Sequence, residues 1–149
     1  MNEKARERAL MLLNRRDYSR KMLIDKITEK GFTQGEAEEV ADSLCALGFI
    51  NDERYAGLVV RHYAAKGYGA QRIKQELFRR GIEKELWDGA LAELPEADDR
   101  IESFIRTRLR GQEPSRENLQ KIIAALQRRG YSWTEIEAAV EHIRENGED

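Results

Sequence analysis

The sequence predicts an all-α fold, built as an elongated tandem array of three three-helix repeats. The first observation is a fixed period, because a basic residue followed by glycine recurs at Gly31, Gly81 and Gly130, 50 and 49 residues apart. Spacing of this size is typical of repeat architectures. The second is that apolar residues recur at helical spacing on both sides of each glycine. The third is that no run of alternating β-branched residues predicts a strand.

Each of these glycines is predicted to end a helix. Apolar side chains stand eight and four residues before it, on one helical face. They are Leu23 and Ile27, Ile73 and Leu77, and Ile122 and Leu126. Glycine adopts the left-handed conformation at little cost, and Lys or Arg in the last turn suits the helix dipole.

A second helix is predicted to begin directly after each glycine. Two copies carry a capping box at the same offset: Thr33 with Glu36, and Ser132 with Glu135. The second copy has Glu83 and Leu86 at these positions and lacks the box. Apolar residues then follow at spacings of four and three: Ala37, Ala41 and Leu44; Trp87, Leu91 and Leu94; Ile136, Val140 and Ile143. We expect Trp87 and Trp133 to pack in the core or between modules.

A further helix precedes each helix pair, which completes a module of three. Its apolar positions are in register between the copies: Ala5, Ala9 and Leu13; Tyr55, Val59 and Tyr63; Ile101, Ile105 and Leu109. The third copy needs a loop three residues longer, and residues 111–114 contain the Gly and Pro that punctuate helices. The predicted modules are residues 1–51, 52–97 and 98–149.

The charge follows the repeat, although the net charge is only −2. Residues 1–30, 54–82 and 100–130 carry net charges of +4, +6 and +5. The segments after them carry −6, −6 and −5. If modules stack regularly, a basic and an acidic stripe run along the molecule and suit an extended partner. The alternative is that these charges serve only helix dipoles and contacts between modules.

The turn around each glycine resembles the helix-turn-helix shape that reads DNA. In that mode the second helix enters the major groove, but here the second helix is acidic in every copy, as with Glu36, Glu38 and Glu39. We therefore do not expect base reading in the groove. The basic helices before the glycines remain candidates for contact with the phosphates of single- or double-stranded DNA.

The candidate partner- and phosphate-binding residues lie mainly in the central module, which has the largest basic excess. They are Arg61, Lys66, Tyr68, Arg72, Lys74, Arg79, Arg80, Arg128 and Arg129. Tyr18 and Tyr68 share one offset before a helix, where a tyrosine either packs on its own helix as a hydrophobic staple or stacks on a partner. The flanking Gly67 and Gly69 make Tyr68 the stronger candidate for a partner.

The sequence contains no pattern of catalytic residues, so we expect a non-enzyme without cofactor or metal. His62 and His142 are too far apart in sequence for a typical metal site, and there is no phosphate-binding glycine loop. The single Cys45 excludes an intramolecular disulfide and favours a cytoplasmic setting. A charged N-terminus and the lack of long apolar stretches predict no membrane segment. We expect a monomer.

Two segments are similar to the RecX family, whose members regulate the RecA recombinase. The first runs Leu44-x-x-Leu47-Gly48-Phe49-Ile50-Asn51-Asp52-x-x-Tyr55-Ala56. The second runs Gly69-x-x-Arg72-Ile73-x-x-Glu76-Leu77-x-x-Arg80-Gly81-Ile82. The third module departs from the pattern, because residues 115–118 replace the turn that contains tyrosine.

The resemblance implies an all-helical regulator that binds along the groove of the RecA–single-stranded DNA filament. It implies modulation, mainly inhibition, of RecA activities, and hence of recombination, DNA repair and the SOS response. The alternative that the residues leave open is a helical-repeat adaptor that binds another protein without nucleic acid.

Overall fold

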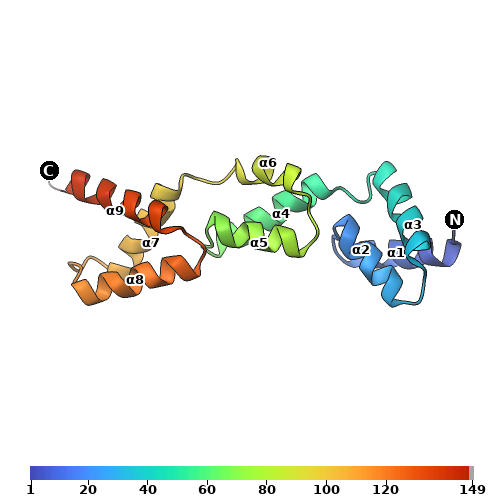
Figure 1. The fold of residues 1–149 in the computed structure, drawn as a ribbon, viewed down its shortest axis with the longest axis horizontal. Helices are drawn as coiled ribbons and strands as arrows, with labels where there is room; N and C mark the ends of the chain where they lie inside the picture. Colours follow the sequence, from blue (N-terminus) through green and yellow to red (C-terminus); the bar gives the residue numbers. More distant parts are fainter. Residues whose placement is uncertain (148–149) are drawn as a thin grey trace. The chain divides into compact units, whose positions relative to one another are not determined.

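The computed structural model describes residues 1–147 and confirms the all-α class, because this range holds nine α-helices, one 3₁₀ helix and no strand. The helices follow one another in the predicted order of three per repeat (Figure 1). They are α1 (Glu3–Arg15), α2 (Arg20–Glu29), α3 (Gln34–Ala46), α4 (Asp52–Ala65), α5 (Ala70–Arg79), the 3₁₀ helix (Lys84–Leu86), α6 (Trp87–Leu91), α7 (Ala97–Leu109), α8 (Arg116–Arg128) and α9 (Trp133–Gly147). No helix in this range is long and apolar enough to cross a bilayer.

The chain divides into two compact units. The first holds Met1–Val59 and Glu76–Ala90, and the second holds Val60–Gln75 and the chain from Leu91 onward. All three boundaries fall inside helices, so α4, α5 and α6 contribute to each unit. Each unit therefore contains one whole repeat together with a part of the second repeat.

In the first unit, α1, α2 and α3 pack around one apolar core. The predicted helical faces supply it: Ala5, Ala9, Leu23, Ile27, Ala37, Ala41 and Leu44 are fully buried. Polar side chains fix the helix starts, since Ser19 Oγ accepts a hydrogen bond from Met22 N at 3.2 Å. Both predicted bonds of the Thr33–Glu36 capping box are present, at 3.1 and 2.8 Å.

The end of α5 rests on the start of α2 within the first unit. The buried Ser19 Oγ donates a hydrogen bond to the Arg80 carbonyl oxygen at 2.5 Å. The next residue, Gly81, has a φ of +74°, and a Cβ placed on it would lie 2.5 Å from the Cβ of Lys21. Gly81 is thus required twice, once by its left-handed backbone and once by the close approach to α2.

In the second unit, α7 packs on α8 and α9 around a second apolar core. Its buried residues include the predicted positions Ile101, Ile105, Ile122, Leu126 and Ile136. Ser115 Oγ caps α8 by accepting from Asn118 N at 3.1 Å. The Ser132–Glu135 capping box of α9 is also confirmed, with bonds of 3.1 and 2.9 Å.

The end of α8 rests on the start of α5 within the second unit. Gly69 N donates to the Arg129 carbonyl oxygen at 2.6 Å, and Gln71 N donates to the Gly130 carbonyl oxygen at 3.2 Å. A Cβ on Gly130, whose φ is +94°, would lie 2.5 Å from the Arg72 nitrogen. At Gly31, by contrast, no atom comes within 4 Å of the added Cβ. All three glycines follow a helix as predicted, and two of them also form a contact between repeats.

The third helix of the second repeat is shorter than predicted. The spacing predicted one helical face through Leu94, whereas the structure has a 3₁₀ turn and then α6, which ends at Leu91. Glu83 makes no side-chain cap bond at this helix start, as expected from the missing capping box. Gly89 inside the short helix further lowers its helix propensity.

The two tryptophans differ in burial, which corrects one prediction. Trp87 is half-buried and its Nε1 donates to the Ile82 carbonyl oxygen at 2.9 Å, in line with a packed residue. Trp133 was expected to pack as well, but 55% of it is exposed. It is the first residue of α9, one turn before Ile136, which is the first residue of that helix in the core.

Candidate functional site

The nine predicted partner-binding residues are distributed over both units. Arg79 and Arg80 belong to the first unit. The second unit contains the others: Arg61, Lys66, Tyr68, Arg72, Lys74, Arg128 and Arg129. Their contact with a partner stays a prediction. Their intramolecular contacts show which of these cations already pair with a carboxylate and which do not.

In the first unit, Arg79 and Arg80 neutralise a buried carboxylate. Glu76 is only 1% exposed. Arg80 Nη1 donates to Glu76 Oε2 at 2.5 Å and to the Glu76 carbonyl oxygen at 3.1 Å. Arg79 Nη1 lies 3.6 Å from Glu76 Oε1, while most of its side chain stays exposed. The Arg80 guanidinium is therefore already engaged in contacts that stabilise the fold.

In the second unit, Arg61 is also paired, because its Nη1 lies 3.3 Å from Glu93 Oε2. Arg128 is exposed at the end of α8, and Lys74 is half-buried on α5. No described carboxylate lies within ion-pairing distance of either residue. Arg128 is thus an exposed cation, and its contact with a partner stays a prediction.

Tyr68 is packed, although it was the favoured aromatic contact for a partner. Its ring centroid lies 5.6 Å from that of Tyr63 in an edge arrangement, and the Arg72 guanidinium lies 5.3 Å from it. Tyr18, at the same offset in the first repeat, is 7% exposed within the core. Both tyrosines therefore pack on their own repeat, and half-buried Tyr68 keeps the larger accessible surface.

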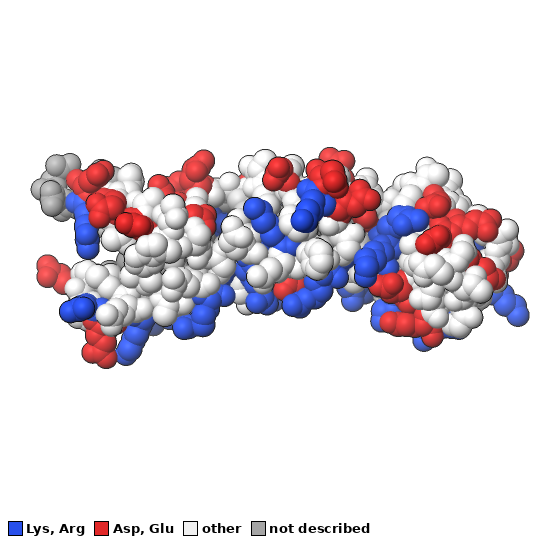
Figure 2. Space-filling model, viewed as in Figure 1, with Lys and Arg blue, Asp and Glu red and all other residues white. Residues whose placement is uncertain are grey.

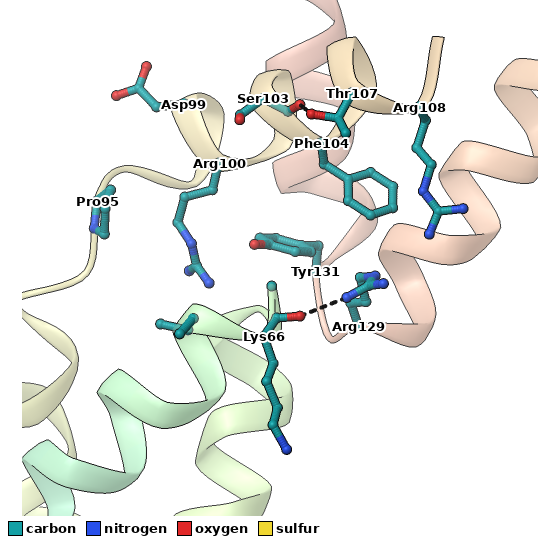
Figure 3. A pocket seen from close by; sticks show the side chains of 13 residues that line it. Lys66, Pro95, Asp99, Arg100, Ser103, Phe104, Thr107, Arg108, Arg129 and Tyr131 are labelled. Atoms are coloured by element: carbon teal, nitrogen blue, oxygen red, sulfur yellow. Dashed lines mark hydrogen bonds between the residues drawn. The ribbon is translucent and has the colours of Figure 1, made fainter. Parts of the chain in front are cut away.

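A cleft of about 690 Å³ opens in the second unit between the end of α4, the outer face of α7 and the turn from α8 to α9 (Figure 3). Two of the predicted residues, Lys66 and Arg129, belong to its wall. They are joined, because Arg129 Nη1 donates to the Lys66 carbonyl oxygen at 2.9 Å. Residues 63 positions apart in sequence are thus brought to one site.

Guanidinium groups and aromatic rings alternate along this cleft. The Phe104 ring has two guanidinium carbons close to its centroid, that of Arg108 at 4.9 Å and that of Arg129 at 5.1 Å. The Arg100 guanidinium lies 5.3 Å from the Tyr131 ring, and its Nη2 donates to the Tyr68 carbonyl oxygen. Such cation–π contacts contribute about 0.5–1 kcal/mol each at exposed sites. They hold the guanidiniums in place without neutralising them.

The cations of the cleft have no described carboxylate within ion-pairing distance. This is true of Lys66, Arg100, Arg108 and Arg129, whereas Arg106 on the same helix α7 pairs with Glu102 at 2.5 Å. Asp99 lies at the rim, and its carboxylate points away from the cleft in Figure 3. The cleft is therefore a concentration of positive charge that an anion would stabilise.

Tyr131 forms an uncharged part of the wall. It is 5% exposed, and burial raises the pKa of its phenol, with a smaller opposing effect from Arg100. The phenol therefore stays protonated at neutral pH and does not act as a base. In the described part of the chain, no group of His, Cys, Asp or Glu is placed to hold a metal ion.

Sequence reasoning missed four residues of the cleft: Arg100, Phe104, Arg108 and Tyr131. A signal for three of them was present, because Arg100, Phe104 and Arg108 follow one another at intervals of four residues and so share one face of α7. The apolar register instead used the neighbouring positions Ile101, Ile105 and Leu109. Tyr131 follows Gly130 directly, at the position that Phe32 and Ile82 occupy in the other repeats.

Comparison with known proteins shows the family of this chain. A model described as "RecX, first three-helix domain" matches residues 5–44, and one described as "RecX, second three-helix domain" matches residues 51–91. The chain is 35% identical over 130 residues to "Regulatory protein RecX" of Trichlorobacter lovleyi, covering 83% of this chain and 84% of that protein. It is 37% identical over 136 residues to "Regulatory protein RecX" of Xanthomonas citri, covering 89% and 83%.

Solved structures agree in fold. The crystal structure of RecX from Lactobacillus salivarius superposes with a TM-score of 0.83 at 22% identity, covering 95% of this chain and 96% of that one. A second structure, titled "Crystal structure of regulatory protein RecX", gives a TM-score of 0.78 at 23% identity, covering 93% and 71%. From its similarity to these relatives over most of their length, and from its two matched three-helix domains, the chain belongs to the RecX family of regulatory proteins.

Proposed function

We propose that this protein is a non-enzymatic regulator, mainly an inhibitor, of a RecA recombinase in the cytoplasm. It acts by binding along the groove of the RecA–single-stranded DNA filament, and so modulates recombination, DNA repair and the SOS response. The observation that carries the proposal is membership of the RecX family, whose relatives bear the name "Regulatory protein RecX".

The charge distribution of the second unit supports a partner that contains both protein and phosphate. Helix α8 carries Arg116, Lys121 and Arg128 against a single acidic residue, whereas α9 is predominantly acidic. In Figure 2, blue atoms gather along α8 and red atoms over α9. A filament offers polyanionic DNA to the basic face and protein side chains to the acidic face.

A second candidate function is an adaptor that binds another protein without nucleic acid. It is favoured by large apolar side chains exposed on the first unit: Leu47 (59%), Phe49 (53%), Leu58 (39%) and Phe78 (70%). Contiguous patches of exposed apolar side chains mark sites where proteins bind one another. The same side chains would contact recombinase subunits under the first proposal.

Titration of the protein into assembled RecA–DNA filaments tests the proposal. ATP hydrolysis and filament length are followed together. Falling hydrolysis with length preserved supports binding in the groove, whereas shortening filaments support capping of the filament end. A protein that changes neither quantity at saturating concentration leaves only the adaptor function.

A further inference from the structure

The arginine-rich cleft of the second unit has features that the proposed function does not require. Arg100, Arg108 and Arg129 are held by rings and by carbonyl oxygens, which accept hydrogen bonds but carry no net charge. Gathering cations without a counter-charge costs Coulomb energy, which a bound anion offsets. Arg106 and Arg61 already pair with carboxylates, so a bound anion would offset no such Coulomb energy there.

The shape and lining of the cleft narrow the class of anion. Its volume of about 690 Å³ lies within the range of small-ligand sites, which is roughly 300–1,000 Å³. One part of the wall is apolar, with Ala64, Ala65, Pro95 and the half-buried Phe104. A guanidinium fork matches the oxygens of a phosphate, and an apolar or aromatic wall beside it receives the flat face of a base.

We propose that this cleft binds one nucleotide unit, with its phosphate on Arg108 and Arg129 and its base against Phe104 and the alanines of α4. The nucleotide comes from a single strand of nucleic acid or from a free nucleotide, which share this chemistry. A duplex keeps its bases stacked inside and cannot offer one to a concave site. An acidic peptide would satisfy the arginines but would leave the apolar wall without a flat partner.

The proposal goes beyond regulation of the recombinase, because nucleotide binding can be measured with this protein alone, without the recombinase. The test uses the full chain and a fluorescently labelled oligothymidylate, with binding followed by anisotropy at two salt concentrations. Unlabelled thymidine monophosphate, duplex DNA, inorganic phosphate and oligoglutamate serve as competitors. Competition by the free mononucleotide, relative to the oligonucleotide, separates the two sources of nucleotide.

The informative variant is Arg108→Gln, because the Arg108 side chain is exposed and its guanidinium contacts the Phe104 ring. We expect oligothymidylate to bind roughly tenfold more weakly, as for loss of a hydrogen bond to a charged group. We also expect the salt slope of log K to fall by about 0.7, the value for one phosphate contact on a single strand. Arg106→Gln, two residues away and outside the cleft, is the matched control and should bind within about twofold of wild type.

Besides unchanged binding by Arg108→Gln, two further results would overturn the nucleotide cleft. One is an equal loss of affinity in Arg108→Gln and Arg106→Gln, which would mean a diffuse charge effect. The other is displacement of the oligonucleotide by oligoglutamate at concentrations where thymidine monophosphate and phosphate do not act, which would assign the cleft to an acidic protein segment. Phe104→Leu keeps apolar volume but removes the aromatic ring, so it distinguishes the base contact from the phosphate contact. It should weaken the binding of oligothymidylate more than the binding of inorganic phosphate.

Failure here is distinguishable from failure of the proposed function. If Arg108→Gln binds oligothymidylate like wild type and still inhibits the recombinase, the cleft assignment falls while the regulatory function stands. If the variant loses oligothymidylate binding and the wild type has no effect on filaments, the cleft stands and the regulatory function falls.

Discussion

Glycine does two physically different things at equivalent positions of the three repeats. Gly31, Gly81 and Gly130 all have positive φ, so any substitution meets backbone strain of about 1–2 kcal/mol. Only Gly81 and Gly130 also lie against the preceding repeat, at distances that leave no room for a Cβ. At Gly31 nothing lies within 4 Å of an added Cβ, so only the backbone conformation favours glycine there.

We therefore expect Gly130→Ala to destabilise the protein by about 3 kcal/mol or more, because the Arg72 backbone nitrogen lies 2.5 Å from the new Cβ and cannot rotate away. Gly31→Ala should cost only the backbone strain of about 1–2 kcal/mol. Urea denaturation followed by circular dichroism measures both. Equal losses in the two variants would show that the close approach has no energetic weight.

The neighbours Arg79 and Arg80 offer a second comparison at single residues. Arg80→Ala removes two hydrogen bonds to Glu76, which is 1% exposed, and should cost about 3 kcal/mol. Arg79→Ala removes an exposed contact of 3.6 Å and should cost less than about 1 kcal/mol. Thermal melts of the two variants at equal salt decide this. Charge reversal at Arg80 is accordingly a poor probe of partner binding, because it disturbs the fold.

At the scale of elements, caps and helix ends account for most of what the sequence predicted correctly. The two capping boxes, the glycine stops and the apolar faces rest on residues at most eight positions apart, where chain geometry fixes the spacing. The short α6 was missed because apolar spacing through Leu94 was given more weight than the absent cap and Gly89. The cleft was missed because Lys66, Phe104 and Arg129 meet only through packing of distant helices.

The capping box of α3 predicts a pH dependence. Hydrogen bonds from the Thr33 backbone nitrogen, from Asn2 and from the Thr33 hydroxyl lower the pKa of Glu36. A lowered folded pKa means that the carboxylate stabilises the fold above the unfolded value of about 4.3 and loses this effect as the pH falls through the folded pKa. The stability difference between wild type and Glu36→Gln should therefore shrink on acidification below about pH 4.3. A constant difference from pH 7 to pH 3 would contradict this.

Substitution of Gly89 should stabilise α6, the helix whose length was predicted wrongly. Gly89 lies inside α6 without positive φ, and nothing lies within 4 Å of an added Cβ. Gly89→Ala should raise the free energy of unfolding by about 0.5–1 kcal/mol through helix propensity. Gly111→Ala has equally open surroundings but a φ of +80°, so it should lower stability instead. Melting temperatures test this: Gly89→Ala should raise the melting temperature and Gly111→Ala should lower it, and shifts of the same sign would contradict the prediction.

At the scale of the whole molecule, equivalent contacts recur between repeats, as the sequence pattern does. Each unit contains one joint in which a glycine ending the middle helix of one repeat meets the start of the middle helix of the preceding repeat. The sequence predicted the period and the alternation of charge, because both are linear properties. It did not predict that Arg61 is neutralised, since only the fold brings Glu93 near it. The Glu76–Arg80 pair, by contrast, lies at helical i,i+4 spacing that the sequence already contains.

The central claim is that unneutralised cations of a RecX-family protein bind the RecA–single-stranded DNA filament. The most direct measurement is the concentration of protein that halves ATP hydrolysis by preformed filaments. It compares wild type, a Lys66→Glu/Arg128→Glu variant and the control Arg144→Glu, whose exposed arginine pairs with Glu141 on the acidic α9. We predict at least a tenfold increase for the double variant and a change within about twofold for the control, with unchanged helical circular dichroism. Equal inhibition by all three proteins would contradict the claim.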